Sequence, residues 1–317
     1  MLLDIVSLLG GLVLLVIAAD WLVDGAVGVA RRLGIPPLVV GLTIVAYGTS
    51  LPEFVVSLLS AHRGVVEFAI GNIVGSNIAN VALVLGAAAL IHPIAIKGGL
   101  LFKRDLPVLA VTTALAIVFF LDGVVSRVEG VVLALITVGF TIVCLRSPEE
   151  ESDGDDAPED EGAPWPRAPL LVVIGLVGLV GGAHLMVEGG ASIAATFGVD
   201  ERIIGLTIVA VGTSLPELAT SVAGAMKGHS GLAVGNVVGS CIFNLAFVLG
   251  ATALIKPPVV DVSAMSVDLA LMGGLAVVMW VMLRTGYRMS RGEGGGLLAV
   301  YAGFVAFLVW QTVTGVA

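Results

Sequence analysis

Two glutamates within apolar sequence are the residues best suited to chemistry in this chain. Glu53 and Glu217 each follow a Gly-Thr-Ser-Leu-Pro run, near the middle of a stretch apolar enough to cross a membrane. An ionisable side chain at that depth costs about 3 kcal/mol or more, so it predicts a functional site. Two such carboxylates repel each other unless positive charge lies between them. The pair therefore predicts a site for a divalent cation or for several monovalent ones.

Oxygen-bearing groups surround both glutamates. Pro52 and Pro216 have no N–H group, so each leaves the carbonyl four residues earlier without its helical partner. We expect a discontinuous helix at each proline, with freed carbonyls facing inward. Hydroxyl and amide side chains on these segments and on the next predicted helices are the further candidate ligands: Thr49, Ser50, Thr213, Ser214, Ser76, Asn80, Ser240 and Asn244. Ligands that are all oxygen suit Ca²⁺ or Na⁺ better than zinc or copper.

The two glutamate segments are copies of one another. Residues 41–80 and 205–244 align at a constant offset of 164 positions, and 23 of the 40 positions are identical. Each half of the chain has five predicted membrane helices. Because five is an odd number, the second half would enter the membrane from the opposite face. The repeat is therefore predicted to have inverted topology, which is typical of secondary transporters and brings matched helices together at mid-membrane.

The composition indicates a membrane protein. Of 317 residues, 58% are hydrophobic and 12% are charged, whereas a soluble domain carries about 25% charged residues. We predict an all-α membrane protein with ten transmembrane helices arranged as two inverted-topology five-helix repeats. The predicted spans are 2–29, 36–62, 66–91, 105–121, 127–145, 169–195, 201–226, 231–255, 264–284 and 295–315.

An acidic run divides the chain into three predicted segments. Nine acidic and no basic residues lie between Glu149 and Glu161, and they account for the formal net charge of −9. We predict a first repeat at 1–146, a solvated linker at 147–168 and a second repeat at 169–317. Eleven of the fifteen Lys and Arg residues fall in loops on the linker's side of the membrane. This distribution predicts a multi-pass protein of the cell membrane with a cytoplasmic linker and extracellular termini.

Other residues carry weaker predictions. Asp24 and Glu188 also match at the offset of 164, and we expect interfacial acids or helix-end contacts there. Asp20 aligns with His184, and neither is assigned a role. Both cysteines are expected to be small buried hydrophobes. No basic patch is present, so nucleic acid is excluded as a partner, and no cofactor or obligate protein partner is indicated.

The GTSLPE and GNxxGSxxxN segments resemble the two α-repeats of the cation/Ca²⁺ antiporter superfamily, and specifically its sodium/calcium exchanger branch of prokaryotic type. The likeness extends over essentially the whole chain. Proton/calcium exchangers of the superfamily carry GNxxE-type repeats where this chain has Gly48–Glu53 and Gly212–Glu217, so that branch fits less well. The resemblance implies a prokaryotic source, and we expect an archaeal one.

The resemblance also implies how ions are held. Ca²⁺ is expected between Glu53 and Glu217, together with the backbone carbonyls of Thr49 and Thr213. Sodium ions would share that site and occupy two flanking ones. The flanking sites would draw on two matched sets of oxygens: the Ala46 carbonyl with Ser50 and Ser240, and the Ala210 carbonyl with Ser214 and Ser76.

Two asparagines complete the implied site. Asn80 and Asn244 would close the central position. Potassium-dependent exchangers, and some prokaryotic ones, carry Asp at the position of Asn244. Asparagine in both copies leaves two ionisable ligands, which argues against potassium co-transport.

The predicted function is secondary active antiport of Na⁺ against Ca²⁺ by alternating access to one shared mid-membrane site. Two fixed negative charges hold one Ca²⁺ or two to three Na⁺ but not both sets, so exchange needs no chemical step and no enzyme activity is expected. The partners are the two ions and the lipid bilayer. The alternatives are a proton/calcium or other cation antiporter and a cation channel. The first and sixth spans, which are long and apolar, are expected to slide across the ion-binding core.

Overall fold

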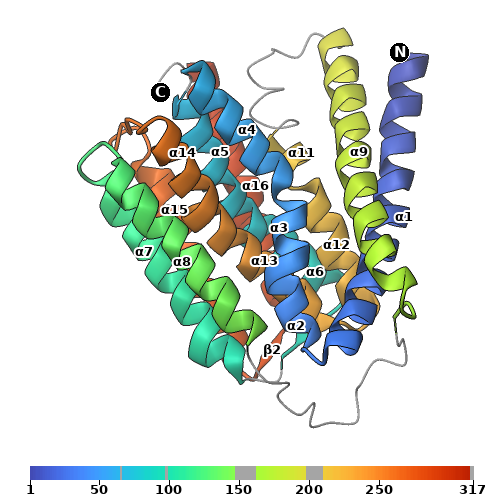
Figure 1. The fold of residues 1–317 in the computed structure, drawn as a ribbon. Helices are drawn as coiled ribbons and strands as arrows, with labels where there is room; N and C mark the ends of the chain where they lie inside the picture. Colours follow the sequence, from blue (N-terminus) through green and yellow to red (C-terminus); the bar gives the residue numbers. More distant parts are fainter. Residues whose placement is uncertain (65, 97–98, 147–161, 198–209, 315–317) are drawn as a thin grey trace.

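The computed structural model describes residues 1–64, 66–96, 99–146, 162–197 and 210–314, and it is a bundle of long apolar helices (Figure 1). The linker residues 147–161 lie outside this part of the chain. The first half contains these elements in order: α1 (Leu2–Leu33), α2 (Pro37–Val40), π-helical η1 (Gly41–Val45), α3 (Ala46–Thr49), α4 (Leu51–Arg63), α5 (Val66–Ala79), π-helical η2 (Asn80–Leu85), α6 (Gly86–Ile91), β1 (Ile94–Ala95), π-helical η3 (Leu101–Asp105), α7 (Leu106–Phe120) and α8 (Arg127–Leu145).

The described helices of the second half follow the same order, but its strand lies between the last two helices. Its described elements are α9 (Arg167–Thr196), α11 (Ala210–Thr213), α12 (Leu215–Met226), α13 (Ser230–Ile242), π-helical η5 (Phe243–Val248), α14 (Leu249–Ile255), α15 (Ser266–Arg284), β2 (Arg288–Met289) and α16 (Arg291–Thr314). The two short strands pair antiparallel, with Ile94 opposite Met289, and add a ribbon to the predicted all-helical fold.

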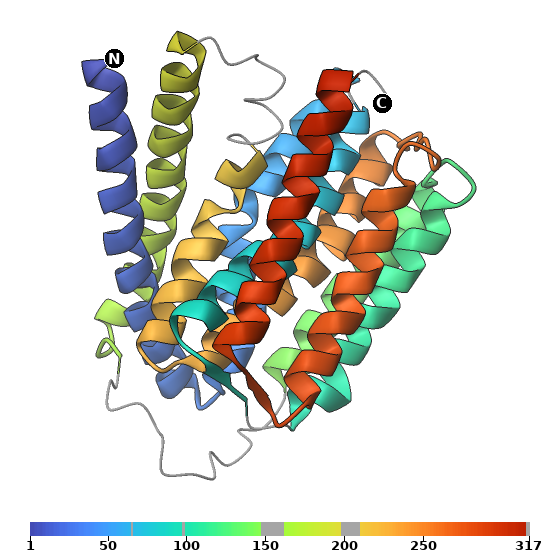
Figure 2. The same ribbon diagram turned by 180° about the vertical axis from the view of Figure 1, so that it is seen from behind.

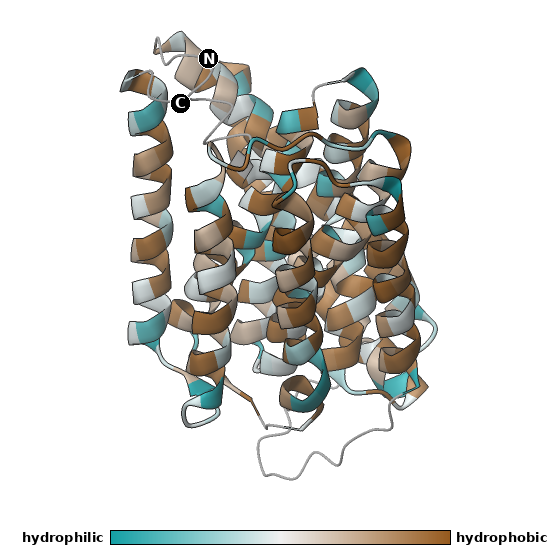
Figure 3. Cartoon of the chain, turned by 90° about the vertical axis from the view of Figure 1, so that its left-hand side faces the viewer, coloured by the Kyte–Doolittle hydropathy of each residue, from teal (hydrophilic) through white to brown (hydrophobic). Residues whose placement is uncertain are grey.

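Seven of the helices in the described ranges are long and apolar enough to cross a membrane. Counting the bent pair Pro37–Thr49 and Leu51–Arg63 as one span raises the number to eight. Apolar residues cover much of the helices seen from the side in Figure 3. The span predicted at 105–121 is the 15-residue helix α7, and the span predicted at 201–226 begins outside the described residues. The protein is therefore a multi-pass, essentially all-helical membrane protein, and the count of ten spans stays a prediction.

Helices α1 and α9 form an antiparallel pair that lies side by side in both views (Figures 1 and 2). Glycine allows the close approach, because a Cβ at Gly25 would lie 2.7 Å from the carbonyl oxygen of Ala168. A Cβ at Gly189 would lie 2.5 Å from the carbonyl oxygen of Asp4. The two contacts are equivalent in the two halves, since Gly25 matches Gly189 and Ala168 matches Asp4 at the offset of 164.

The same doubling recurs elsewhere in the bundle. Residues i and j that touch in one place have counterparts i + 164 and j − 164 that touch in another. The contacts doubled in this way are Gly130 with Gly250 and Gly294 with Gly86, and the bridge of Val124 with Val259 and the strand pair of Arg288 with Ala95. The helix-start bond of Ser126 with Glu129 recurs within the second half as that of Ser290 with Glu293. The relationship found in 41–80 and 205–244 thus extends into the helices that flank them.

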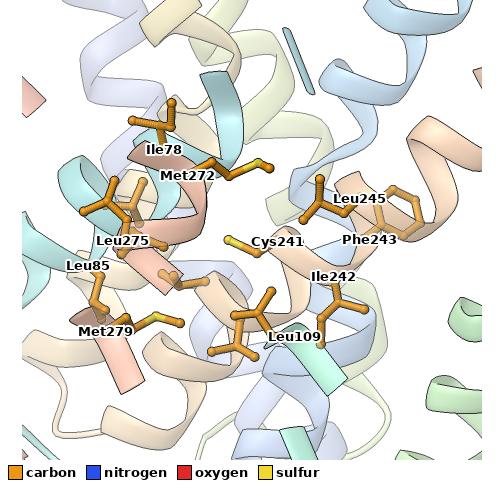
Figure 4. Close-up of a cluster of buried hydrophobic side chains, with 14 of the residues drawn as sticks. Ile78, Leu85, Leu109, Cys241, Ile242, Phe243, Leu245, Met272, Leu275 and Met279 are labelled. Carbon is orange, nitrogen blue, oxygen red and sulfur yellow. The ribbon is translucent and has the colours of Figure 1, made fainter. Parts of the chain in front are cut away.

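The main hydrophobic cluster surrounds α13. Every residue of α13 from Leu232 to Ile242 is buried. Figure 4 shows Cys241 and Ile242 of this helix among Leu109, Met272 and side chains from neighbouring helices. Both cysteines are buried and unbridged, as predicted. A helix buried on all sides gives the neighbouring site residues a rigid support.

Candidate functional site

Both predicted helix breaks are present. The α3–α4 pair bends by 44°, and its break falls at Ser50, where φ is −85° and ψ is 9°. The α11–α12 break falls at Ser214, with nearly the same φ of −89° and ψ of 6°. In each copy the proline occupies the first turn of the second helix, a position that tolerates its missing N–H. The matched glutamate follows directly, so both carboxylates start from the first turn of a helix.

The breaks place the two glutamates opposite each other's serine. Ser50 Oγ donates a hydrogen bond to Glu217 Oε1 at 2.7 Å. In the other direction, Ser214 Oγ donates to Glu53 Oε1 at 3.4 Å. Glu53 is 1% exposed and Glu217 is fully buried. The two halves of the chain therefore build one site, to which each contributes a carboxylate and a hydroxyl.

Buried negative charge at this site has no protein counter-charge. Three acidic side chains are buried among the described residues, and the third, Asp105, has Arg104 Nε at 2.5 Å from its Oδ1. Neither Glu53 nor Glu217 has a cationic partner in that part of the chain. A buried carboxylate without such a partner is strongly unfavourable. A cation bound between the two glutamates would balance both charges.

Four buried oxygens at the site accept no hydrogen bond. They are Oε2 of Glu53 and of Glu217 and Oδ1 of Asn80 and of Asn244. The two asparagines open the π-helical turn η2 and stand second in η5. π-Helical turns often occur at functional sites, because they interrupt the regular helical hydrogen bonds. Carboxylate and amide oxygens are the ligands that a hard cation prefers.

The remaining predicted ligands lie around these groups. Thr49 and Ser240 are fully buried, and Ser240 Oγ donates to the carbonyl of Ala46 at 3.4 Å. Ser76 is buried, and Thr213 is half-buried in α11. Ala210 is the first residue of α11, and its side chain lies outside the described part. The Ala46–Ser240 contact joins the two halves on the first flank, as the resemblance implies.

Two asparagines that we did not predict hold the glutamate helices in place. Asn236 Nδ2 donates to the carbonyl of Glu217 at 3.3 Å and to Ser221 Oγ at 2.9 Å. Asn72 makes the matching bonds to the carbonyl of Glu53 at 3.2 Å and to Ser57 Oγ at 2.9 Å. The signal was available, since both asparagines and both serines are identical at the offset of 164.

Asn236 also reaches across the site. Its Oδ1 accepts a hydrogen bond from Thr49 Oγ1 at 3.1 Å, so one amide ties α3 of the first half to α12 of the second. No group of three or more His, Cys, Asp or Glu residues that could hold a metal occurs in the described ranges. A site of two carboxylates with neutral oxygens suits Na⁺ or Ca²⁺ and lacks the nitrogen and sulfur ligands typical of zinc and copper.

Comparison with known proteins matches the chain at residues 3–146 and 167–310 to the family described as sodium/calcium exchanger protein. The putative antiporter CaxA of Alkalimonas amylolytica is 40% identical, over 96% of this chain and 98% of its own. The sodium/calcium exchanger MaX1 of Methanosarcina acetivorans is 32% identical, over 96% and 97%. The solved structure of the sodium-calcium exchanger NCX_Mj, soaked with Na⁺ and Ca²⁺, superposes with a TM-score of 0.84 at 31% identity and covers 96% of this chain and 98% of that one. These relatives include a bacterial protein, so the expectation of an archaeal source stays a prediction.

Proposed function

The chain belongs to the sodium/calcium exchanger family, and on that premise we propose that it exchanges Na⁺ for Ca²⁺ across a membrane. Members of this family are membrane transporters, not enzymes, so the protein is a cation/Ca²⁺ antiporter. The proposal concerns the identity of the two ions and the residues that hold them. It is carried by one observation: two buried carboxylates from the two halves lie at a single site, and no cationic side chain of the described residues pairs with either.

Ca²⁺ would be held by Glu53 and Glu217. Their four oxygens can face one divalent ion, and the carbonyls of Thr49 and Thr213 would add backbone ligands. The Oδ1 atoms of Asn80 and Asn244 lack partners and would complete the shell. Ca²⁺ takes six to eight oxygen ligands in flexible geometry, and this inventory is large enough.

Na⁺ would use the same two charges. Two or three sodium ions neutralise both carboxylates, so their binding excludes Ca²⁺. The Ser50 and Ser214 hydroxyls already contact the carboxylates and would turn toward the flanking ions. One flank would add the Ala46 carbonyl with Ser240, and the other the Ala210 carbonyl with Ser76. Mutual exclusion at one site is sufficient for coupled exchange.

Alternating access would come from movement of α1 and α9. The glycine contacts hold these two helices together, so they would slide as one body against the helices that carry the site. A carrier with empty carboxylates would not switch, because two uncompensated charges would have to pass through a low-dielectric state. The termini would face outward and the acidic linker would face the cytoplasm.

Flux in proteoliposomes tests the proposal. An outward Na⁺ gradient should drive uptake of radioactive calcium, and the uptake should stop when choline replaces Na⁺ inside the vesicles. Calcium uptake driven by a proton gradient with no Na⁺ present would instead establish a proton/calcium antiporter. Current that persists with one permeant ion on both sides would establish a channel.

A further inference from the structure

A lysine at the end of α12 ties that helix to α1. Lys227 Nζ lies 2.5 Å from Asp20 Oδ1 and 2.5 Å from Asp24 Oδ1. Burial alone would lower the pKa of Lys227, but the hydrogen bonds and charges of the two aspartates outweigh it and raise that pKa above its usual range. Lys227 is therefore fully charged at neutral pH. It forms an ionic link between the α1–α9 pair and the helices that carry the site.

Among the described residues, this link has no counterpart. At the offset of 164, Lys227 matches Arg63, Asp24 matches Glu188, and Asp20 matches His184. Arg63 is exposed and forms no ion pair within the described ranges. Glu188 instead contacts His184 Nε2 on its own helix at 3.2 Å. One end of α9 thus lacks the connection that the matching end of α1 has.

This asymmetry lies at a particular boundary. Contacts within the α1–α9 pair are doubled by the repeat, and so are the asparagine contacts within the site helices. The Lys227 link crosses between these two bodies and is single. In Figures 1 and 2 the upper halves of α1 and α9 stand apart from the other helices of the described ranges, while their lower ends adjoin α12. At this boundary the described residues are therefore not related by the repeat.

We propose that Lys227 and Arg63 are positioning residues of two alternative latches. Lys227 with Asp20 and Asp24 holds α1 against α12 in the state described here. In the oppositely facing state this link opens, and Arg63 at the end of α4 binds Glu188 of α9. The inference rests on the proposed alternating access, but it does not depend on which ions are carried.

The two latches are unequal. The Lys227 latch has two carboxylates, whereas the Arg63 latch has Glu188 and a histidine in place of the second acid. An additional carboxylate near a lysine or arginine strengthens the pairing. The protein is therefore biased toward the state with the Lys227 latch closed, and His184→Asp should reduce that bias.

Distance measurements between spin labels test the latches. Labels on cysteines replacing Leu59 of α4 and Ser192 of α9, in a chain with Cys144 and Cys241 replaced by alanine, report the separation at the Arg63 end.

Lys227→Gln should increase the short-distance population relative to the long one about fivefold, as expected for loss of a partly buried ion pair. Arg63→Gln should decrease it, and His184→Asp should increase it. Lys256→Gln is the control and should leave the distribution unchanged. It removes a cation next to Arg63, since Lys256 Nζ lies 3.1 Å from the ideal Cβ position of Gly64.

Opposite shifts distinguish a latch from a merely structural role, since general loosening would move both variants the same way. Lys227→Asp combined with Asp24→Lys should restore the original distribution. Unchanged distances in both Lys227→Gln and Arg63→Gln, or shifts in the same direction, would overturn the proposal. Because the distances are read without transport, failure of Na⁺/Ca²⁺ exchange in vesicles would leave this result standing and would count only against the proposed function.

Discussion

Ser50 Oγ donates a hydrogen bond at 2.7 Å to Glu217 Oε1, on a residue 167 positions away. The matching bond from Ser214 to Glu53 is longer, at 3.4 Å. Each half of the chain therefore stabilises the charge contributed by the other, and neither half holds a complete site. This arrangement explains why the glutamates occur as a matched pair, since an ion bound between them contacts both halves at once.

The difference in length between these two hydrogen bonds predicts which serine contributes more to Ca²⁺ affinity. Ser50→Ala should weaken Ca²⁺ binding about tenfold, because a hydrogen bond to a charged group contributes about 1.5 kcal/mol or more. Ser214→Ala should weaken it less, because its bond is longer. Titration calorimetry on the purified variants measures both. A larger loss in Ser214→Ala would contradict the ranking.

Asn236 should contribute more to stability than its counterpart Asn72. Asn236→Ala removes three hydrogen bonds from a fully buried position, which should cost about 1–3 kcal/mol. Asn72→Ala removes two bonds from a partly buried position and serves as the matched comparison. Thermal unfolding in detergent, followed by tryptophan fluorescence, should give the lower Tm for Asn236→Ala. Equal Tm values would show that the bond to Thr49 adds nothing.

Potassium should have no effect on exchange. The site has two carboxylates. Asn244 occupies the position where potassium-dependent exchangers, which the chain resembles, carry aspartate. Calcium uptake should be the same in potassium and choline media for the native protein. Asn244→Asp adds a third negative charge and should make uptake respond to potassium. Potassium stimulation of the native protein would show that a further cation site exists.

Packing between α1 and α9 should be necessary for flux and dispensable for ion binding. Gly25→Leu would force a side chain into the carbonyl of Ala168, which lies 2.7 Å from the ideal Cβ position. We expect uptake to fall at least about tenfold while the Ca²⁺ affinity is retained, since a clash of this kind costs about 1–3 kcal/mol. Gly10→Leu is the control, because nothing lies within 4 Å of its Cβ position. Equal loss in both variants would contradict a specific role for the contact.

Much of the site could be predicted because its chemistry is unusual for a membrane interior. A buried glutamate beside proline and glycine is costly, so its presence in two matched segments indicates function without any structural information. The helix breaks at Ser50 and Ser214 followed from the missing N–H of proline. Burial of the predicted ligands followed in turn from their place in spans that carry few charges.

The parts that escaped prediction depend on which segments meet in space. The bonds of Asn236 to Thr49 and of Lys227 to Asp20 join residues 187 and 207 positions apart. Periodicity assigns each residue to a face of its own helix but does not say which helix covers that face. Asp24 does make a helix-end contact, which is one of the two outcomes expected for it, but its partner at the end of α12 was not predicted. The π-helical turns that carry Asn80 and Asn244 were likewise not predicted.

The central claim is that Glu53 and Glu217 form one site shared by Ca²⁺ and Na⁺. Calcium titration calorimetry of the native protein, with and without Na⁺, tests it most directly when Glu53→Gln and Glu217→Gln are measured alongside. We predict a single Ca²⁺ site whose apparent affinity falls as Na⁺ rises, and no measurable Ca²⁺ binding in either variant. Calcium affinity that is unaffected by Na⁺, or native-like binding in either glutamine variant, would contradict the account.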